Sequence, residues 1–180
     1  RRDAAALERW DTHARLPILR EKFIQFLFFT QWQHLRQSCR EAGVRLLADV
    51  PIYVTMDSAD VWSHPDLFYL DADLQPVMVS GVPPDYFSET GQRWGTPLYR
   101  WEEMEKDGFS WWKKRLEHIL LLADMARLDH FRGCCGYWEI PAEEETAVNG
   151  AWKRGPGRSF LQSVQDHFGH LPFVAEDLGV

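Results

Sequence analysis

The sequence is poor in cysteine and contains no long apolar run. Its three cysteines, Cys39, Cys134 and Cys135, are too few for a disulfide framework, and no Cys or His spacing is typical of a metal site. The longest apolar runs, 26–29 and 119–123, are far shorter than the roughly 18 to 20 residues that cross a bilayer. These absences predict a soluble cytoplasmic protein with no metal and no membrane partner.

An excess of positive charge is also missing. The chain has 20 Lys and Arg against 27 Asp and Glu, a net charge of −7, which repels a phosphate backbone. We therefore do not expect the protein to bind nucleic acid. With 45% hydrophobic and 26% charged residues, the 180 residues can bury a sizeable core. Because the chain starts at Arg1 without Met and ends just after a strand-like segment, we expect a part of a larger domain.

Three helix-then-strand units repeat along the sequence. Apolar spacing predicts helices over 20–42, 110–123 and 159–168 and strands over 44–54, 126–131 and 171–175. Ser110 and Ser159 are placed as helix N-caps, and Gly43 and Gly169 are placed where helices end. The first strand is expected to be buried on both faces. The repeat predicts an α/β fold with parallel strands, either a Rossmann-like sheet or part of a (β/α)8 barrel.

The stretch 55–108 is too long for an ordinary connection between a strand and a helix, and it has no helix-length apolar pattern. We expect a long active-site loop or subdomain insertion after one strand. Its Trp62, Trp94 and Trp101 are candidates for stacking on sugar rings. The other six tryptophans, Trp10, Trp32, Trp111, Trp112, Trp138 and Trp152, are expected to be packing residues.

Carboxylates stand at the end of each predicted strand, namely Asp49, Asp129, Glu176 and Asp177. Any one of them could simply cap a helix or form a salt bridge. Sites in α/β folds nevertheless gather at the carboxyl ends of parallel strands, so we expect these acids to form one.

The spacing also suggests different roles for the acids. Arg127 and Asp129 are two residues apart and share a strand face, so the guanidinium is expected to hold Asp129 ionised, as a nucleophile requires. Glu176 and Asp177 point to opposite faces, so at most one joins the site. An acid packed among aromatics instead of beside an Arg would have a raised pKa and could donate a proton, as in retaining glycosidases.

Five ordered motifs carry a resemblance to a known family. They are Asp-Val-Pro-Ile-Tyr-Val at 49–54 with 57–62, Gly-Val-Pro-Pro-Asp-Tyr-Phe-Ser at 81–88, Gly-Gln-Arg-Trp-Gly at 91–95 with 97–99, Arg-Leu-Asp-His-Phe-Arg-Gly at 127–133 and Ala-Glu-Asp-Leu-Gly at 175–179. The sequence resembles the 4-alpha-glucanotransferases, also called amylomaltases or disproportionating enzymes, of glycoside hydrolase family 77. From about residue 18 the resemblance covers the chain, which matches only the middle of the family's barrel.

The resemblance implies a (β/α)8 TIM barrel of the α-amylase type, with 1–180 forming a fragment of one catalytic domain. It implies that Asp129 is the nucleophile, Glu176 the acid/base and Arg127 the residue that orients the nucleophile. It further implies glucan contacts at six residues: Asp49, Asp85, Tyr86, Gln92, Trp94 and His130. A third carboxylate would lie beyond residue 180, so the fragment alone is expected to be inactive.

The implied reaction transfers α-1,4-glucan segments of maltooligosaccharides, starch or glycogen to the 4-hydroxyl of an acceptor, with retention and without a cofactor. The oligomeric state stays open, and a plant or algal source would place the protein in a plastid. One alternative is an α-amylase-type retaining hydrolase, which is disfavoured because 50–54 replaces the Asn-His ending typical of such enzymes. The other alternative is a non-catalytic glucan-binding module.

Overall fold

The computed structural model describes residues 3–176; the expected carboxylate Asp177 lies outside the described residues. The helices are α1 (Ala4–His13), α2 (Arg15–Glu41), α3 (Ala59–Ser63), α4 (Trp101–Lys106), α5 (Ser110–Leu122) and α6 (Arg158–Phe168), with short 3-10 turns at Pro65–Leu67 and Phe131–Cys134. The strands are β1 (Leu47–Pro51), β2 (Met78–Val82), β3 (Gln92–Pro97), β4 (Met125–Asp129), β5 (Gly136–Pro141), β6 (Ala151–Arg154) and β7 (Phe173–Ala175).

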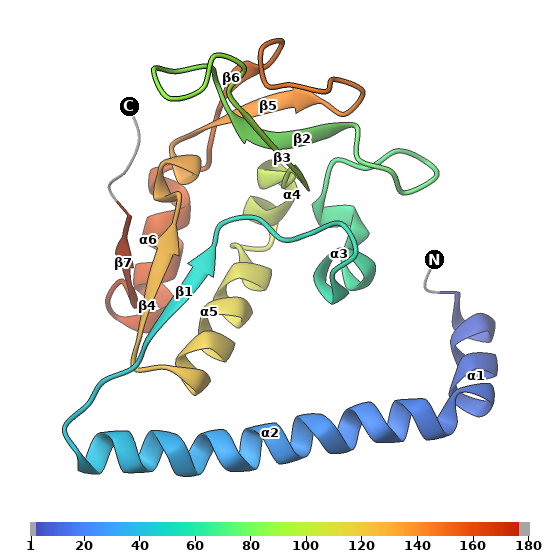
Figure 1. Cartoon of the computed structure of the whole chain (residues 1–180), viewed down its shortest axis with the longest axis vertical. Coiled ribbons are helices and arrows are strands. Elements are labelled where there is room, and N and C mark those ends of the chain that lie inside the picture. Colours follow the sequence, from blue (N-terminus) through green and yellow to red (C-terminus); the bar gives the residue numbers. More distant parts are fainter. Residues whose placement is uncertain (1–2, 177–180) are drawn as a thin grey trace.

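The parallel sheet has the strand order β1-β4-β7, and α2, α5 and α6 each precede one of its strands (Figure 1). The three predicted helix-then-strand units are therefore confirmed. Burial alternates along β4, because Ala126 and Leu128 are fully buried in the core that α5 and α6 help to form. Arg127 and Asp129 are only half-buried and lie on the opposite face. This alternation points the site residues away from the helical layer.

A second, antiparallel sheet with the order β3-β2-β5-β6 lies beyond the carboxyl end of β4 (Figure 1). The sequence patterns did not predict it. Strands β2 and β3 come from the stretch 55–108, which also contains α3 and α4 and is thus more structured than a loop. Strand β5 follows β4 after a single 3-10 turn, so the second sheet begins close to the carboxyl end of β4, where Asp129 lies.

The core is unusually aromatic. Trp101 is 5% exposed and stacks on Trp112 with ring centroids 6.1 Å apart, so its predicted role as an exposed sugar platform is wrong. Trp10 is 66% exposed, and its predicted packing role is wrong as well. Trp152 is 45% exposed but packs against Trp138, with ring centroids 5.5 Å apart, as predicted. Trp94 and Trp62 keep exposed ring surface, as expected of sugar-stacking candidates.

The helix ends are only partly as predicted. Gly43 and Gly169 adopt positive φ values of 70° and 74° directly after α2 and at the end of α6, as predicted. Neither predicted serine cap forms. Ser110 is instead the first residue of α5, and its N–H donates to the Asp107 carboxylate, while the Ser159 hydroxyl donates to the Pro156 carbonyl.

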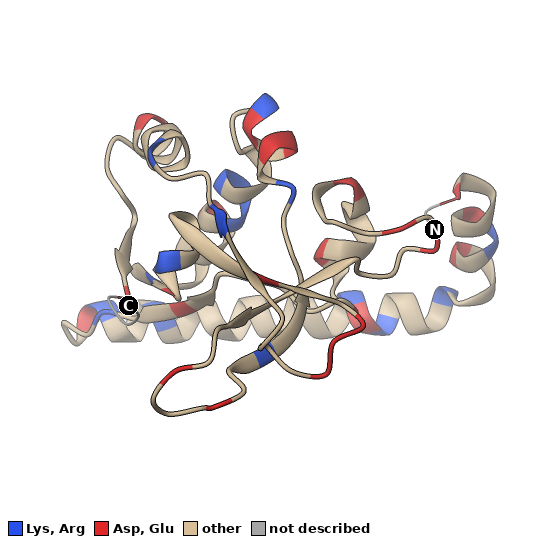
Figure 2. Ribbon diagram, turned by 90° about the horizontal axis from the view of Figure 1, so that it is seen from above, with Lys and Arg blue, Asp and Glu red and all other residues tan. Residues whose placement is uncertain are grey.

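Helix α2 begins earlier than predicted and buries none of its residues within the described part of the chain. Strand β1 is also largely exposed, with only Val50 buried, so its predicted burial on both faces is wrong. The reason is that each lies at the edge of the described structure, where β4 is the only strand paired with β1. The charged residues of α2 lie towards its two ends and are mostly basic, and the loops of the second sheet carry acidic residues (Figure 2).

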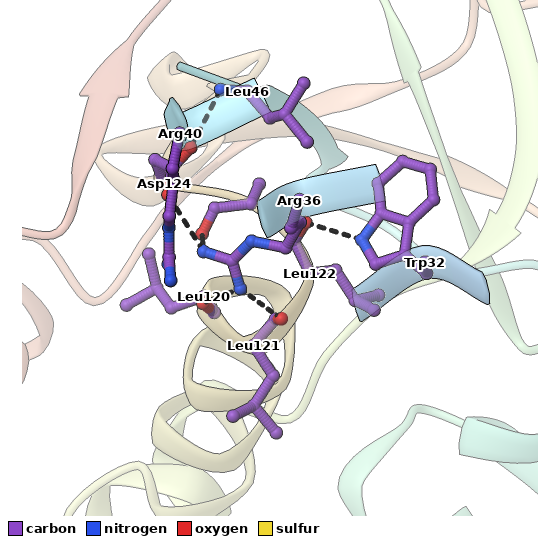
Figure 3. A network of polar contacts seen from close by, with 9 residues as sticks. Trp32, Arg36, Arg40, Leu46, Leu120, Leu121, Leu122 and Asp124 are labelled. Atoms are coloured by element: carbon purple, nitrogen blue, oxygen red, sulfur yellow. Dashed lines mark hydrogen bonds and ion pairs between the residues drawn. The ribbon is translucent and has the colours of Figure 1, made fainter. Parts of the chain in front are cut away.

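A polar network joins α2 to the start of the parallel sheet (Figure 3). The Arg36 guanidinium donates to the carbonyls of Leu120, Leu121 and Ala123 at the end of α5 and to the Asp124 carboxylate. Asp124 also accepts the N–H of Leu46 at 2.9 Å, so one carboxylate ties α2 to the segments that lead into β1 and β4. These hydrogen bonds hold the pKa of Asp124 down at about 2.

None of the described helices combines the length and apolar character needed to cross a bilayer. In residues 3–176, no group of three or more His, Cys, Asp or Glu side chains is arranged to hold a metal ion.

Candidate active site

The register of the parallel sheet brings the first pair of site residues together. Asp49 on β1 lies directly opposite Arg127 on β4. Arg127 Nε donates to Asp49 Oδ1 at 3.0 Å and Nη2 to Oδ2 at 2.6 Å, a bidentate pair. The strand β1 continues to Pro51, so Asp49 lies two residues before the strand end at which it was expected.

The same guanidinium reaches two more carboxylates. Arg127 Nη2 lies 3.2 Å from Asp129 Oδ1, and Nη1 lies 3.5 Å from Glu176 Oε1. The predicted pairing of Arg127 with Asp129 on one strand face is thus confirmed. One cation therefore serves three acids, and these acids come from three adjacent strands.

The electrostatics of the acids differ from the prediction. The Arg127 hydrogen bonds lower the pKa of Asp49. Burial and the neighbouring carboxylates of Glu176 and Asp49 instead raise the pKa of Asp129, although Arg127 opposes this. Arg127 thus favours the ionised form of Asp129, as expected, but burial and two acidic neighbours outweigh its effect on the pKa, because the guanidinium makes its best hydrogen bonds to Asp49.

Glu176 follows β7 and is the most buried of the three acids, with its side chain 14% exposed. Its main-chain N–H donates to the Leu128 carbonyl at 3.1 Å, which continues the ladder between β4 and β7. Its Oε2 accepts the main-chain N–H of His130 at 2.6 Å. The sequence predicted that the proton-donating acid would lie among aromatic residues and away from any Arg. This prediction is wrong for Glu176, because its carboxylate lies beside Arg127.

Three of the predicted sugar-contact residues form a connected group beside the acids. The His130 and Trp94 rings lie 4.8 Å apart and perpendicular, and Trp94 Nε1 donates to Gln92 Oε1 at 3.1 Å. Burial lowers the pKa of His130, although the Glu176 and Asp129 carboxylates oppose this shift. Trp94 is 38% exposed and can offer indole surface to a ligand.

Asp85 and Tyr86 are not joined to this group by any hydrogen bond or ring contact among the described residues. Asp85 Oδ1 accepts the main-chain N–H groups of Phe87 and Ser88, so the side chain shapes its own turn. Tyr86 is 97% exposed and Phe87 is 91% exposed, and their rings contact each other. A contact of Asp85 or Tyr86 with a glucan therefore stays a prediction.

Sequence reasoning missed two contributors to the site. One is the main-chain N–H of His130, which no side-chain pattern can indicate. The other is Tyr53, whose ring lies 6.4 Å from Trp94 and whose buried hydroxyl has no hydrogen-bond partner in the described structure. The position of Tyr53 inside the motif at 49–54 was the available signal.

Parallel strands that follow helices, with carboxylates clustered at their carboxyl ends, define an α/β protein with an active site at that edge of the sheet, either Rossmann-like or a β/α barrel. The family model described as 4-alpha-glucanotransferase matches residues 1–180, and the chain belongs to this family. It is 51% identical over 179 residues to the 4-alpha-glucanotransferase of Aquifex aeolicus, which covers 99% of this chain and 37% of that protein. It is 54% identical over 158 residues to the 4-alpha-glucanotransferase of Thermus thermophilus, and this match covers 88% of this chain and 32% of that protein.

The solved structure of the amylomaltase from Streptococcus agalactiae in complex with acarbose superposes with a TM-score of 0.97 at 38% identity, covering 100% of this chain and 36% of that one. This likeness confirms part of a TIM barrel and excludes the Rossmann-like alternative. The chain spans about a third of the length of the relatives it matches.

Proposed function

We propose that the protein containing this chain is a 4-alpha-glucanotransferase, which transfers α-1,4-glucan segments to the 4-hydroxyl of an acceptor glucan or glucose with retention. The observation that carries the proposal is the convergence of Asp49, Asp129 and Glu176 on Arg127 in a chain of this family. Residues 1–180 would belong to one catalytic barrel domain, with 55–108 as an insertion beside the active site. The substrates would be maltooligosaccharides, starch or glycogen.

In the proposed mechanism, a carboxylate oxygen of Asp129 attacks the anomeric carbon while Glu176 gives its proton to the leaving glycosidic oxygen. The bond to the leaving glucan breaks as the glucosyl ester on Asp129 forms. Glu176, now ionised, then takes the proton of the acceptor 4-hydroxyl, and that oxygen displaces Asp129. Asp129 and Glu176 both contact the Arg127 guanidinium, at 3.2 and 3.5 Å, and this common partner supports the close pair of acids, about 5 to 5.5 Å apart, that retention requires.

Arg127 would orient Asp129 and Asp49 during both steps. Trp94, His130 and Gln92 would contact the glucan beside the acids, and Asp85 and Tyr86 would contact it from the loop after β2. A third carboxylate would come from a part of the barrel beyond residue 180, so these 180 residues alone would be inactive. We place the protein in the cytoplasm; the relatives from Solanum tuberosum and Arabidopsis thaliana are chloroplastic or amyloplastic.

Product analysis with maltotriose and the full-length protein tests the proposal. A ladder of shorter and longer glucans supports a transferase. Glucose and maltose alone would indicate a hydrolase, and no products would indicate a binding module. Asp129→Asn is the control, because it preserves the size of the side chain and removes the nucleophile.

A further inference from the structure

Strand β4 ends in an unusual backbone conformation. His130 has φ 51° and ψ 46°, the left-handed region that L-residues with a side chain rarely occupy. Such a conformation persists only where the surroundings fix it. The residue also lies immediately after Asp129, so the conformation occurs at the centre of the site.

Three features hold the His130 turn. The Gly133 N–H donates to the His130 carbonyl at 2.9 Å and begins a 3-10 turn. The imidazole packs against Trp94. Gly133 is packed so closely that an added Cβ would lie 2.7 Å from the Ile52 side chain. The segment after β4 is therefore fixed on both sides.

The turn redirects one hydrogen bond of the sheet. In the ladder between β4 and β7, Leu128 lies opposite Ala175, and the Glu176 N–H donates to the Leu128 carbonyl. In a parallel ladder of this register, the next donor on β4, the His130 N–H, would meet the main-chain carbonyl of residue 176. It meets the Glu176 side chain instead, at Oε2. The carboxylate has taken the position of a backbone acceptor.

We propose that the main chain of His130, and not only its imidazole, positions the acid/base of the reaction. The His130 N–H occupies Oε2, so Oε1 is the oxygen of Glu176 that is left to exchange a proton with the substrate. Oε1 is the oxygen that faces the Arg127 guanidinium, which also binds Asp129. The turn at His130 thus fixes which oxygen of Glu176 faces Arg127 and Asp129. This inference rests on the proposed function.

The direct test removes the N–H and keeps the imidazole. In the full-length protein, residue 130 is replaced by the α-hydroxy acid of histidine, which changes the amide into an ester. The matched control places glycolic acid at Gly155, which removes an N–H that donates to the Cys135 carbonyl at 2.8 Å and leaves both the N–H of residue 130 and the hydrogen bond that closes its turn. Two substrates are compared: maltotriose, and α-glucosyl fluoride, whose leaving group needs little protonation.

We expect the ester at residue 130 to lower kcat/KM for maltotriose by about 10- to 100-fold, and fluoride release by less than about threefold. The control ester should lower both rates by less than about threefold. Equal losses with the two substrates, or equal losses from the two esters, would overturn the proposal. A native protein that does not convert maltotriose would refute the proposed function instead, so the two failures are distinguishable.

A second pair of variants covers the case in which the esters do not fold. His130→Asn and His130→Val both lose the imidazole, but Asn tolerates the left-handed conformation and β-branched Val does not. The Asn variant should retain more activity on maltotriose than the Val variant, with equal fluoride release. Equal maltotriose activity in the two variants would overturn the proposal.

Discussion

Replacing Arg36 with Met should loosen the start of the parallel sheet. Arg36 and Arg40 are four residues apart on α2, and both contact Asp124 Oδ1, at 2.9 and 3.3 Å. Their surroundings differ, because the Arg36 side chain is 12% exposed and the Arg40 side chain is 56% exposed. Arg36 alone also serves the carbonyls at the end of α5, which have no partner within the helix.

The two arginines should therefore differ in their contribution to local stability. Loss of a poorly exposed, charged hydrogen-bonding group costs about 2–4 kcal/mol, which corresponds to roughly 30- to 1,000-fold faster local opening. An exposed ion pair contributes less than about 1 kcal/mol, or roughly fivefold. Met keeps the apolar part of the Arg36 side chain, so the loss of stability in Arg36→Met measures the contribution of the guanidinium group alone.

Hydrogen exchange of the native full-length protein measures this difference directly. The informative amides are those of Leu46, which donates to Asp124, and of Asp124 and Met125, which donate to the Leu46 carbonyl. They should exchange roughly 30- to 1,000-fold faster in Arg36→Met and at most about fivefold faster in Arg40→Met. If the two variants exchange alike, the reasoning from burial is refuted.

Four further predictions concern pH, the loop and the acids. The pKa of Asp124 is about 2 in the folded protein, which is below the value for an unfolded chain. The contribution of the Asp124 carboxylate to folding stability is therefore complete above about pH 4 and is lost as the pH falls towards 2. The Leu46 amide should exchange faster over this range, and Asp124→Asn should abolish this pH dependence. Because the pKa of Asp129 is raised, activity should fall on acidification at a higher pH than an ordinary aspartate would give, as a pH profile of kcat/KM with maltotriose would show; an acidic limb at or below the ordinary value contradicts this. The Tyr86→Ala, Phe87→Ala double variant should raise the ratio of hydrolysis to transfer, since water would reach the glucosyl ester; an unchanged ratio argues against a covering loop. Glu176→Gln treated with α-glucosyl fluoride should carry a glucosyl group on the peptide that contains Asp129, and a label on Asp49 would reassign the nucleophile.

The sequence was most informative where its signal is local. The alternation along β4 predicted that Arg127 and Asp129 share a face, and the 3.2 Å contact between them agrees. Alternation follows from strand geometry alone, so it needs no knowledge of neighbouring strands. The same holds for the glycines after α2 and α6, whose positive φ is a property of the residue itself.

Features that depend on contacts across strands were not predictable. The bidentate pairing of Asp49 with Arg127 follows from the register of β1 against β4, which the sequence of neither strand fixes. The raised pKa of Asp129 depends on acids from two other strands. The second sheet was missed for the same reason, since β2 pairs with β5 more than 50 residues later, and its Gly81 and Ser80 are poor strand formers.

Because the site has three carboxylates and only one guanidinium, it should bind a cationic ligand in preference to a neutral one. With one acid protonated, Arg127 and its three carboxylates together have a net charge of −1, and with none protonated the net charge is −2. A ligand with a protonated amine at the position of the anomeric carbon would gain an attraction that a neutral sugar of equal shape lacks. Acidification would remove this preference, because it neutralises the carboxylates and leaves Arg127 charged.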